Sequence, residues 1–352
     1  MQSSSIRIQE AVPLAPYTTF RIGGPARYFC QINTESALVE AIEFARQHSL
    51  PIFVLGGGSN LLVSDSGFNG LVLHIAIDAP FKPVSNASLL DYTVAAGTDW
   101  NDFVLKVCEQ GISGVECLAG IPGSVGGTPV QNVGAYGQEV ADTIISVRAL
   151  DLETDAFVDL SRDQCGFAYR RSIFNSTHRN RYIVTAVTFR FDPAVKPILI
   201  YSDLIRHFMG QRPTPIDIYH AVRAIRHSKG MLIVEGEDDC RSAGSFFKNP
   251  IVAEAALTGI ADTLNVSRDR IPHWQAGDGL IKLPAAWLLE QAGFPKGFVL
   301  GNAGISSRHS LALINRGSAT AADIAMLRDN IRHQVKSRFN IELEQEPVQP
   351  GV

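Results

Sequence analysis

Two glycine-rich segments in the first half of the chain place the tightest limits on its fold. The first is Gly56-Gly57-Gly58-Ser59-Asn60, which follows a short apolar run, residues 51–55, typical of a β-strand. The second, residues 111–137, contains eight glycines together with Ser, Thr, Asn and Gln. A glycine backbone lets N–H groups approach an anion closely, so both segments are candidate phosphate-binding loops. For the first segment, a plain tight turn is the alternative.

The second segment is predicted to be ordered despite its weak periodicity. Ile121, Val125, Val130 and Val133 interrupt it, and such apolar side chains favour burial. The first segment is neither a GxGxxG sequence opening a helix nor a Walker A motif, because no GK[ST] follows it. Two ordered glycine-rich loops in one half of the chain therefore favour an extended diphosphate ligand, such as a dinucleotide.

Composition restricts the expected partners and the compartment. A formal net charge of -4, without a Lys/Arg-rich block, argues against general nucleic-acid binding. The cysteines form no CxxC pair, which argues against a disulfide framework or a zinc site and fits a reducing cytoplasm. They are Cys30, Cys108, Cys117, Cys165 and Cys240. The nine histidines are scattered, so no metal site is predicted. Residues 1–10 do not resemble a signal peptide, and no apolar run reaches the ~20 residues that span a bilayer.

Periodicity and capping residues predict alternating helices and strands. Strands are expected at 26–32, 51–55, 71–75, 92–96, 182–191, 245–252 and 311–314, with a hairpin over 143–160. Helices are expected after Thr34 or Asn33, after Asp99 or Thr98, and at 216–227, 253–264 and 284–291. A last helix is predicted to bury the stripe Ile324, Leu327, Ile331, Val335 and Phe339. Composition changes near 192–197 and again at Pro213 and Pro215, where a domain boundary is expected.

Several blocks, in order along nearly the whole chain, carry a resemblance to a known family. They are YTTFRIGGPA at 17–26, LGGGSNLL at 55–62, AGIPGSVGGTPVQNVGAYG at 119–137, YRRSIF at 169–174, GSFFKNP at 244–250, PAAWLLEQAGFPKG at 284–297 and GNAG at 301–304. Together they resemble the UDP-N-acetylenolpyruvoylglucosamine reductase family, also called UDP-N-acetylmuramate dehydrogenases.

The resemblance implies an α+β fold with an FAD-binding domain of the vanillyl-alcohol-oxidase type. That domain would cover 1–195, as two α+β lobes at about 1–76 and 77–195. A linker at 196–212 would lead to an α+β UDP-sugar substrate domain at 213–352, whose C-terminal strand returns to the active site. FAD would be bound non-covalently by both glycine-rich segments. The implied cofactor-binding residues are Gly56, Gly57, Gly58, Ser59, Asn60, Gly120, Ile121, Pro122, Gly123, Ser124, Gly126, Gly127 and Thr128.

The implied reaction is the NADPH-dependent reduction of UDP-N-acetylglucosamine enolpyruvate to UDP-N-acetylmuramate, a step of peptidoglycan precursor synthesis. NADPH would reduce FAD and leave. Reduced flavin would then transfer hydride to the β carbon of the enolpyruvyl group, and an acid would protonate the α carbon. The resemblance and the composition together lead us to expect a cytoplasmic monomer that takes a small UDP-sugar and has no nucleic-acid or membrane partner.

Three residues match catalytic positions of the family. Arg170 would stabilise the charge that develops on the α carbon and its carboxylate, although the residue alone would suggest a structural salt bridge. Ser245 matches the proton donor, although alone it would be called a turn residue. Glu344 matches the catalytic glutamate as the first acid of an LExE motif. The chain then departs from the family pattern at 347–350, so Glu346 is an alternative candidate for the catalytic acid. In the non-functional alternative, this acidic segment is simply the solvated end of a strand.

Six further residues are candidates for contact with the substrate. Tyr201 resembles a mobile tyrosine that covers the diphosphate, and three other side chains match positions that contact the UDP moiety: Lys229, Asn249 and Lys296. Tyr136 and Tyr169 are additional candidates, for which simple packing is the alternative. Segment 231–241 (MLIVEGEDDCR) differs from the family in length and charge, and no role is assigned to it.

Three other functions are weighed against the reductase. A flavin oxidase of the same superfamily would often tether FAD through His or Cys, and the GSFFKNP block would then have no purpose. A non-enzymatic nucleotide-sugar-binding protein would not need Arg170 and Ser245. A purely structural protein would leave the two glycine-rich segments unexplained.

Overall fold

The computed structural model describes residues 6–351 and divides them into two compact units. Residues 1–5 lie outside this range, and they form half of the segment, residues 1–10, that does not resemble a signal peptide. Of the described residues, the first unit comprises 6–12, 26–58 and 69–227, and the second comprises 13–25, 59–68 and 228–351. This division is not the contiguous one expected from the sequence. Two early segments join the C-terminal part because their apolar residues, among them Phe20 and Leu62, are buried in its core.

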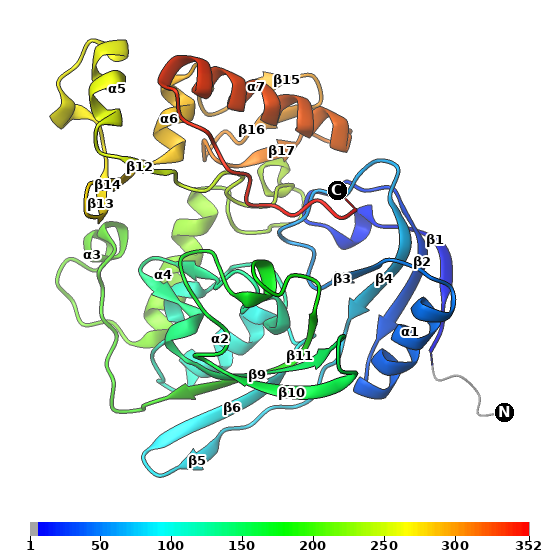
Figure 1. Ribbon diagram of the computed structural model, residues 1–352. Coiled ribbons are helices and arrows are strands. Elements are labelled where there is room, and N and C mark those ends of the chain that lie inside the picture. Colours follow the sequence, from blue (N-terminus) through cyan, green and yellow to red (C-terminus); the bar gives the residue numbers. More distant parts are fainter. Residues whose placement is uncertain (1–5, 352) are drawn as a thin grey trace. The chain divides into compact units, whose positions relative to one another are not determined.

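The first unit contains two sheets (Figure 1). A four-stranded sheet has the order β1-β2-β4-β3, with β3 and β4 parallel. Its strands are β1 (Gln9–Pro13), β2 (Pro25–Ile32), β3 (Ile52–Leu55) and β4 (Phe68–Ile75). A five-stranded antiparallel sheet has the order β10-β9-β11-β6-β5. Its strands are β5 (Val84–Asn86), β6 (Leu89–Ala95), β9 (Ile144–Asp151), β10 (Ala156–Ser161) and β11 (Tyr182–Phe191).

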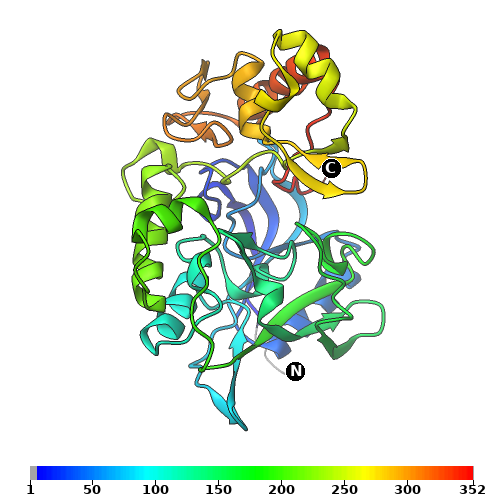
Figure 2. The same cartoon turned by 90° about the vertical axis from the view of Figure 1, so that its left-hand side faces the viewer.

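The helices of the first unit begin at the predicted caps. Thr34 Oγ1 accepts a hydrogen bond from the Ala37 N–H at the start of α1 (Glu35–Gln47). Asp99 accepts from two N–H groups of the first turn of α2 (Trp100–Glu109). Two more helices follow the large sheet, α3 (Ser202–Phe208) and α4 (Pro215–Ser228). Helix α4 lies near α2 (Figure 1; Figure 2 shows the same fold turned by 90°), and Asn101 Nδ2 in the first turn of α2 donates to the Tyr219 hydroxyl of α4 (2.9 Å).

The core of the first unit is aromatic where α2 packs on the large sheet. Trp100, Tyr92, Phe103 and Phe189 are fully buried, and the rings of Phe103 and Phe189 lie 4.7 Å apart. Burying such rings contributes strongly to stability, because each removes a large apolar area from water. This packing fixes α2, and with it the loop that follows.

The second unit is built from two small antiparallel sheets and three helices (Figure 1). One sheet has the order β12-β14-β13, from β12 (Ile251–Ala253), β13 (Trp274–Gly277) and β14 (Leu280–Lys282). The other has the order β15-β16-β17, from β15 (Val299–Leu300), β16 (Ala303–Ile305) and β17 (Leu313–Asn315). The helices are α5 (Ala256–Leu264), α6 (Ala285–Gln291) and α7 (Ala321–Phe339). Every residue of the predicted α7 stripe is buried.

The short strands β1, β5 and β13 to β16 were not predicted. Two further differences have a clear local reason. The strand expected over 245–252 is reduced to β12, because Pro250 lacks an N–H and residues 245–249 are irregular. Helix α3 was not predicted. Its two buried side chains, Leu204 and Phe208, are four residues apart, and a helix of seven residues gives too short a periodic signal.

Candidate functional site

The two glycine-rich segments lie backbone against backbone in the first unit. A Cβ added at Gly57 would lie 2.5 Å from the Gly123 Cα and 3.1 Å from the Ser124 nitrogen. A Cβ at Gly126 would likewise lie 2.5 Å from the Ala96 Cβ. Only glycine permits such approaches. The predicted phosphate-binding loops are therefore brought together, and the first one is more than an isolated tight turn.

Several backbone donors in these segments are available to a ligand. Among the described residues, the N–H groups of Gly57, Gly58, Gly123 and Ser124 donate to no protein acceptor. Most other N–H groups of the second segment are used internally, for example by Val125 to the Thr98 carbonyl (2.9 Å). Clustered backbone donors form an anion-binding concavity, so the first unit has the features that a diphosphate requires. Ser59 and Asn60, which were expected beside them, belong to the second unit.

The second segment is ordered, as predicted. Val125 and Thr128 are buried, and short 3-10 turns at Glu116–Leu118 and Val125–Gly127 interrupt the segment. It ends in a small hairpin formed by β7 (Gly134–Ala135) and β8 (Gln138–Glu139). Its internal contacts hold the glycines in place.

Helices α2 and α4 hold Gly120 of the second segment, and the sequence did not predict these contacts. The Gly120 N–H donates to Asn101 Oδ1 (2.9 Å), and Arg226 Nε donates to the Gly120 carbonyl (3.1 Å). Arg226 is buried, which lowers the pKa of its guanidinium to about 10. A signal was present in the sequence, because Arg226 lies four residues after the buried Val222 and therefore falls on the apolar stripe of a predicted helix.

Arg170 occupies a tight turn in the first unit. Ala168 and Arg171 exchange backbone hydrogen bonds of 2.9 and 3.0 Å, so Tyr169 and Arg170 form a two-residue turn. Arg170 has a left-handed backbone (φ +54°), and its Nη2 donates to the Gly134 carbonyl (2.9 Å). Asn175 Nδ2 donates to the Arg170 carbonyl (3.1 Å). A non-glycine residue in this conformation is strained, and such strain is concentrated at functional sites.

The three candidate tyrosines lie near the Arg170 turn. The guanidinium of Arg170 is 5.6 Å from the centroid of the Tyr169 ring. Tyr136, two residues beyond Gly134, meets the Tyr201 ring edge-on at 5.1 Å. Tyr169 and Tyr201 are both exposed by 41%, so each has a face open to a ligand.

Ser245 and both candidate glutamates lie in one ladder of the second unit. Phe247 bridges antiparallel to Gln345. The Lys248 N–H donates to the Glu344 carbonyl (3.0 Å), and the Glu346 N–H donates to the Phe246 carbonyl (2.9 Å). This register puts Ser245 at the end of the ladder nearer to Glu346.

The two glutamates differ in environment. The Glu344 side chain is 72% exposed and pairs with Lys248 Nζ at 2.5 Å. Glu346 is half-buried, and Asn60 Nδ2 donates to its carbonyl (3.4 Å). Glu346 is therefore the less exposed of the two candidate acids and the nearer to Ser245 along the ladder.

The remaining candidate residues of the second unit are more dispersed. Asn249 Oδ1 accepts from the Ala285 N–H at the start of α6 (2.9 Å). Lys229 is half-buried, whereas Lys296 is exposed in the loop after α6. In the part of the chain that the structure describes, no hydrogen bond or ion pair joins Lys296 to Asn249.

Segment 231–241 is held by its acidic residues. Asp239 is buried, accepts from the Ser307 N–H (3.0 Å) and hydroxyl (2.7 Å), and pairs with Arg308 (3.2 Å). Arg308 also pairs with Glu237. The acidic side chains of this segment, Glu237 and Asp239, thus bind it to the loop before β17.

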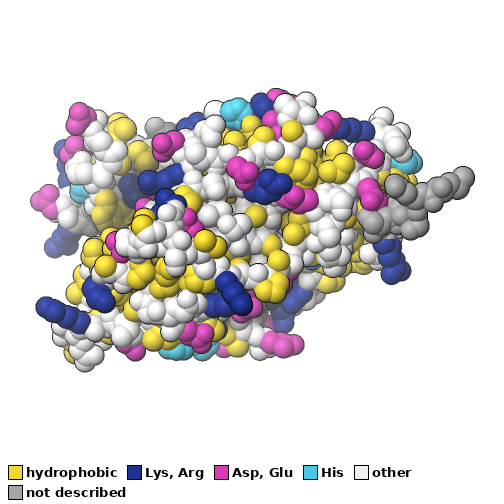
Figure 3. Space-filling model, turned by 90° about the horizontal axis from the view of Figure 1, so that it is seen from below, with side chains coloured by type: hydrophobic (Ala, Val, Ile, Leu, Met, Phe, Trp, Pro, Cys, Tyr) yellow, Lys and Arg dark blue, Asp and Glu magenta, His cyan; other side chains and the backbone are white. Residues whose placement is uncertain are grey.

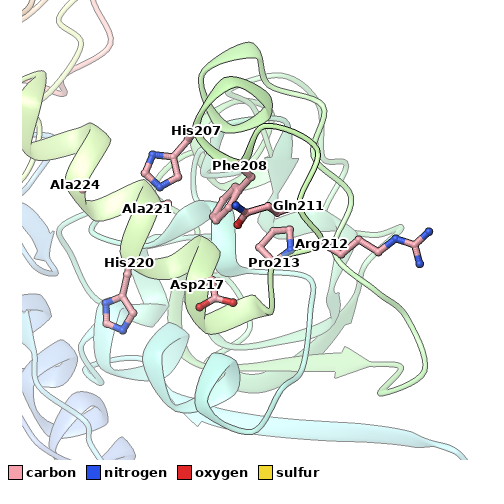
Figure 4. A pocket seen from close by; sticks show the side chains of 9 residues that line it. All are labelled: His207, Phe208, Gln211, Arg212, Pro213, Asp217, His220, Ala221 and Ala224. Carbon is pink, nitrogen blue, oxygen red and sulfur yellow. The ribbon is translucent and has the colours of Figure 1, made fainter.

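A cavity of about 470 Å³ in the first unit contains none of the predicted site residues (Figure 4). It lies beside α3 and the first half of α4, and His207, His220 and Asp217 are among its lining residues.

The face shown in Figure 3 carries Lys and Arg interspersed with Asp and Glu, so it presents no field of a single sign. Among residues 6–351, no group of three potential ligands would hold a metal, and no helix is long and apolar enough to cross a membrane.

Comparison with known proteins identifies the family. A model described as "UDP-N-acetylenolpyruvoylglucosamine reductase, C-terminal domain" matches residues 236–349, and one described as "FAD binding domain" matches 26–161. The UDP-N-acetylenolpyruvoylglucosamine reductase of Thermobifida fusca is 43% identical over 97% of both chains. The chain belongs to the UDP-N-acetylenolpyruvoylglucosamine reductase family. The reductase of Streptomyces coelicolor is 41% identical over 97% of this chain and 89% of its own.

A solved structure agrees with this family and fold. The reductase of Thermus caldophilus has a TM-score of 0.65 and 27% identity, and the match covers 98% of this chain and 99% of that one. The predicted family and the predicted α+β fold, an FAD-binding domain followed by the reductase C-terminal domain, are confirmed. The FAD-domain match includes both glycine-rich segments, and the reductase C-terminal match includes Ser245, Glu344 and Glu346. Arg170, Tyr169, Tyr201 and Lys229 lie outside both matches.

Proposed function

We propose that this protein is an FAD-dependent UDP-N-acetylmuramate dehydrogenase that uses NADPH to reduce UDP-N-acetylglucosamine enolpyruvate. The observation that carries the proposal is the near-full-length match to the Thermobifida fusca reductase, at 43% identity. Membership of the reductase family favours this function over a flavin oxidase. A monomeric enzyme of the cytoplasm belongs to the same proposal.

FAD, when bound, supplies the hydride for reduction of the substrate. We assign its diphosphate to the free N–H groups of Gly57, Gly58, Gly123 and Ser124, because the two segments that carry these groups touch at Gly57 and Gly123 and free backbone donors bind anions. Non-covalent binding is supported by the cysteines, which are all buried. Burial raises the pKa of the Cys117 and Cys165 thiols to about 12, so neither is a ready nucleophile.

We assign Arg170 to the charge that develops on the substrate carboxylate and α carbon. A guanidinium is always ionised and presents a planar fork of donors that matches a carboxylate. Its backbone is held by the turn between Ala168 and Arg171, and Nη2 is oriented by the Gly134 carbonyl. A cation held before the reaction begins stabilises the transition state without reorganisation.

We assign the protonation of the α carbon to Ser245, and the supporting carboxylate to Glu346 in preference to Glu344. Three hydrogen bonds steady the segment that carries Ser245. The Gly244 N–H donates to Ser242 Oγ (3.3 Å), and the Phe246 N–H donates to the Leu311 carbonyl (2.8 Å). Thr19 donates to the Ser242 carbonyl (2.5 Å). A hydroxyl is a weak acid, so its proton transfer depends on such fixed geometry.

The two half-reactions test this function directly. The purified protein should be yellow, bleach when NADPH is added without oxygen, and recover its colour when UDP-N-acetylglucosamine enolpyruvate is added. Recovery with oxygen only would refute the substrate assignment and leave the flavoprotein. A colourless protein that takes up no FAD would refute the function altogether.

The Ser245→Ala variant should leave the bleaching by NADPH intact and slow the recovery of colour by roughly 10²- to 10⁴-fold, the usual contribution of a proton-transferring group. Stopped-flow absorbance of the flavin measures both rates separately. The proton-donor assignment fails if the two half-reactions slow by the same factor.

The Glu346→Gln variant should slow the same recovery, whereas Glu344→Gln should stay near the wild-type rate. The reason is that Glu344 is exposed and occupied by Lys248, and an exposed ion pair contributes little. The two substitutions change the same functional group two residues apart, so each controls for the other. If Glu344→Gln recovers its colour more slowly than Glu346→Gln, the role of supporting carboxylate belongs to Glu344.

A further inference from the structure

A buried asparagine connects the Arg170 turn to the second glycine-rich segment. We propose that Asn132 is a positioning residue, which fixes the orientation of the Arg170 guanidinium for reduction of the substrate. The inference rests on the catalytic role proposed for Arg170. Asn132 itself would touch neither substrate nor cofactor.

The Arg170 turn needs support from outside itself. It consists of two residues only, and Arg170 has a left-handed backbone at φ +54°. That conformation is disfavoured for an L-residue, because its Cβ lies too close to the following carbonyl oxygen. Ala168 and Tyr169 are exposed, whereas Ser172 directly after the turn is fully buried, so core packing holds only the C-terminal side of the turn.

Asn132 supplies part of that support. Asn132 is only 1% exposed, and its Nδ2 donates to the Ala168 carbonyl (3.1 Å) at the base of the turn. Nδ2 also donates to Glu139 Oε2 (2.7 Å), and Oδ1 accepts from the Ala141 N–H (3.2 Å). Because both ends of the amide are engaged, the side chain has one orientation.

The same asparagine also controls the group that orients the guanidinium. Arg170 Nη2 donates to the Gly134 carbonyl, and Gly134 pairs with Glu139 in the β7–β8 hairpin. Asn132 therefore joins two structures that hold Arg170. One is the base of the turn at Ala168, and the other is the β7–β8 hairpin, whose Gly134 carbonyl accepts the hydrogen bond from the Arg170 guanidinium. A second link, from Ser172 Oγ to the Val130 carbonyl (2.6 Å), holds the far side of the turn. Loss of Asn132 should leave the turn attached but its orientation less defined.

The test uses the FAD-loaded enzyme and two variants. Asn132→Gly removes the side chain and still accepts the left-handed backbone at this position (φ +47°). Asn340→Gly is the matched control, because Asn340 is also left-handed (φ +55°) but ends α7 in the second unit. Asn132→Gly should keep its flavin and its rate of bleaching by NADPH. Its recovery of colour by the enolpyruvyl substrate should slow by roughly 10- to 100-fold, as expected when a catalytic group is misplaced. Asn340→Gly should change neither rate.

A double variant distinguishes positioning from a general structural role. If Asn132 acts through Arg170, Asn132→Gly combined with Arg170→Ala should be no slower than Arg170→Ala alone. Multiplying effects would overturn the inference, as would loss of flavin or equal slowing of both half-reactions in Asn132→Gly. If Arg170→Ala itself leaves colour recovery unchanged, the proposed role of Arg170 fails instead. If Arg170→Ala is slow and Asn132→Gly is fast, only the positioning inference fails.

Discussion

Replacing Arg170 with alanine should slow the reduction of the enolpyruvyl substrate by about 10³-fold, the scale seen when a preorganised charge-stabilising donor is removed. The bleaching of the flavin by NADPH should keep its normal rate, because no carboxylate charge develops in that step. Rapid-mixing absorbance measures the two rates in one preparation.

The neighbouring Arg171 offers a matched control. The Arg171 side chain is exposed, and the hydrogen bonds of this residue within the turn are made by its backbone, so Arg171→Ala should behave as the wild-type enzyme. Added guanidinium ion should restore part of the activity of Arg170→Ala, since it supplies the missing charge and donors. A structural salt bridge, the alternative that the sequence left open, would show no rescue and would lower thermal stability instead.

Replacing Gly57 with alanine should produce a folded protein that binds FAD at least about 10-fold more weakly. The new Cβ would lie 2.5 Å from the Gly123 Cα, so the two glycine-rich segments must move apart. Overpacking of this kind costs typically about 1–3 kcal/mol, and here the displaced atoms carry the free N–H donors. Titration of the apoprotein with FAD, followed by flavin fluorescence, gives the dissociation constant.

Gly259→Ala controls for the added methyl group. Gly259 lies within α5, and no atom lies within 4 Å of a Cβ placed there. The substitution should leave FAD affinity unchanged and raise stability slightly, because alanine favours helices. Unchanged FAD affinity in Gly57→Ala would mean that the contact between the two segments does not form the diphosphate site.

Most helices and the longest strands could be predicted because their signals are local. Thr34 and Asp99 cap the helices that follow them, and the stripe from Ile324 to Phe339 is buried as its spacing requires. These features depend on neighbours within four residues along the chain. By contrast, α3 was missed because a seven-residue helix offers one buried pair only.

The sequence alone determined the family and the fold class, and its resemblance to the family supplied the candidate site residues. Motifs carry such information because each block keeps its residue types in order along the chain. Only the tertiary structure decided which distant residues meet. The pairing of Gly57 with Gly123, the hold of Arg226 on Gly120, and the link from Asn132 to Ala168 each join residues far apart in sequence. No local propensity encodes these contacts, because they arise when burial and hydrogen-bond satisfaction are resolved for a whole compact unit at once.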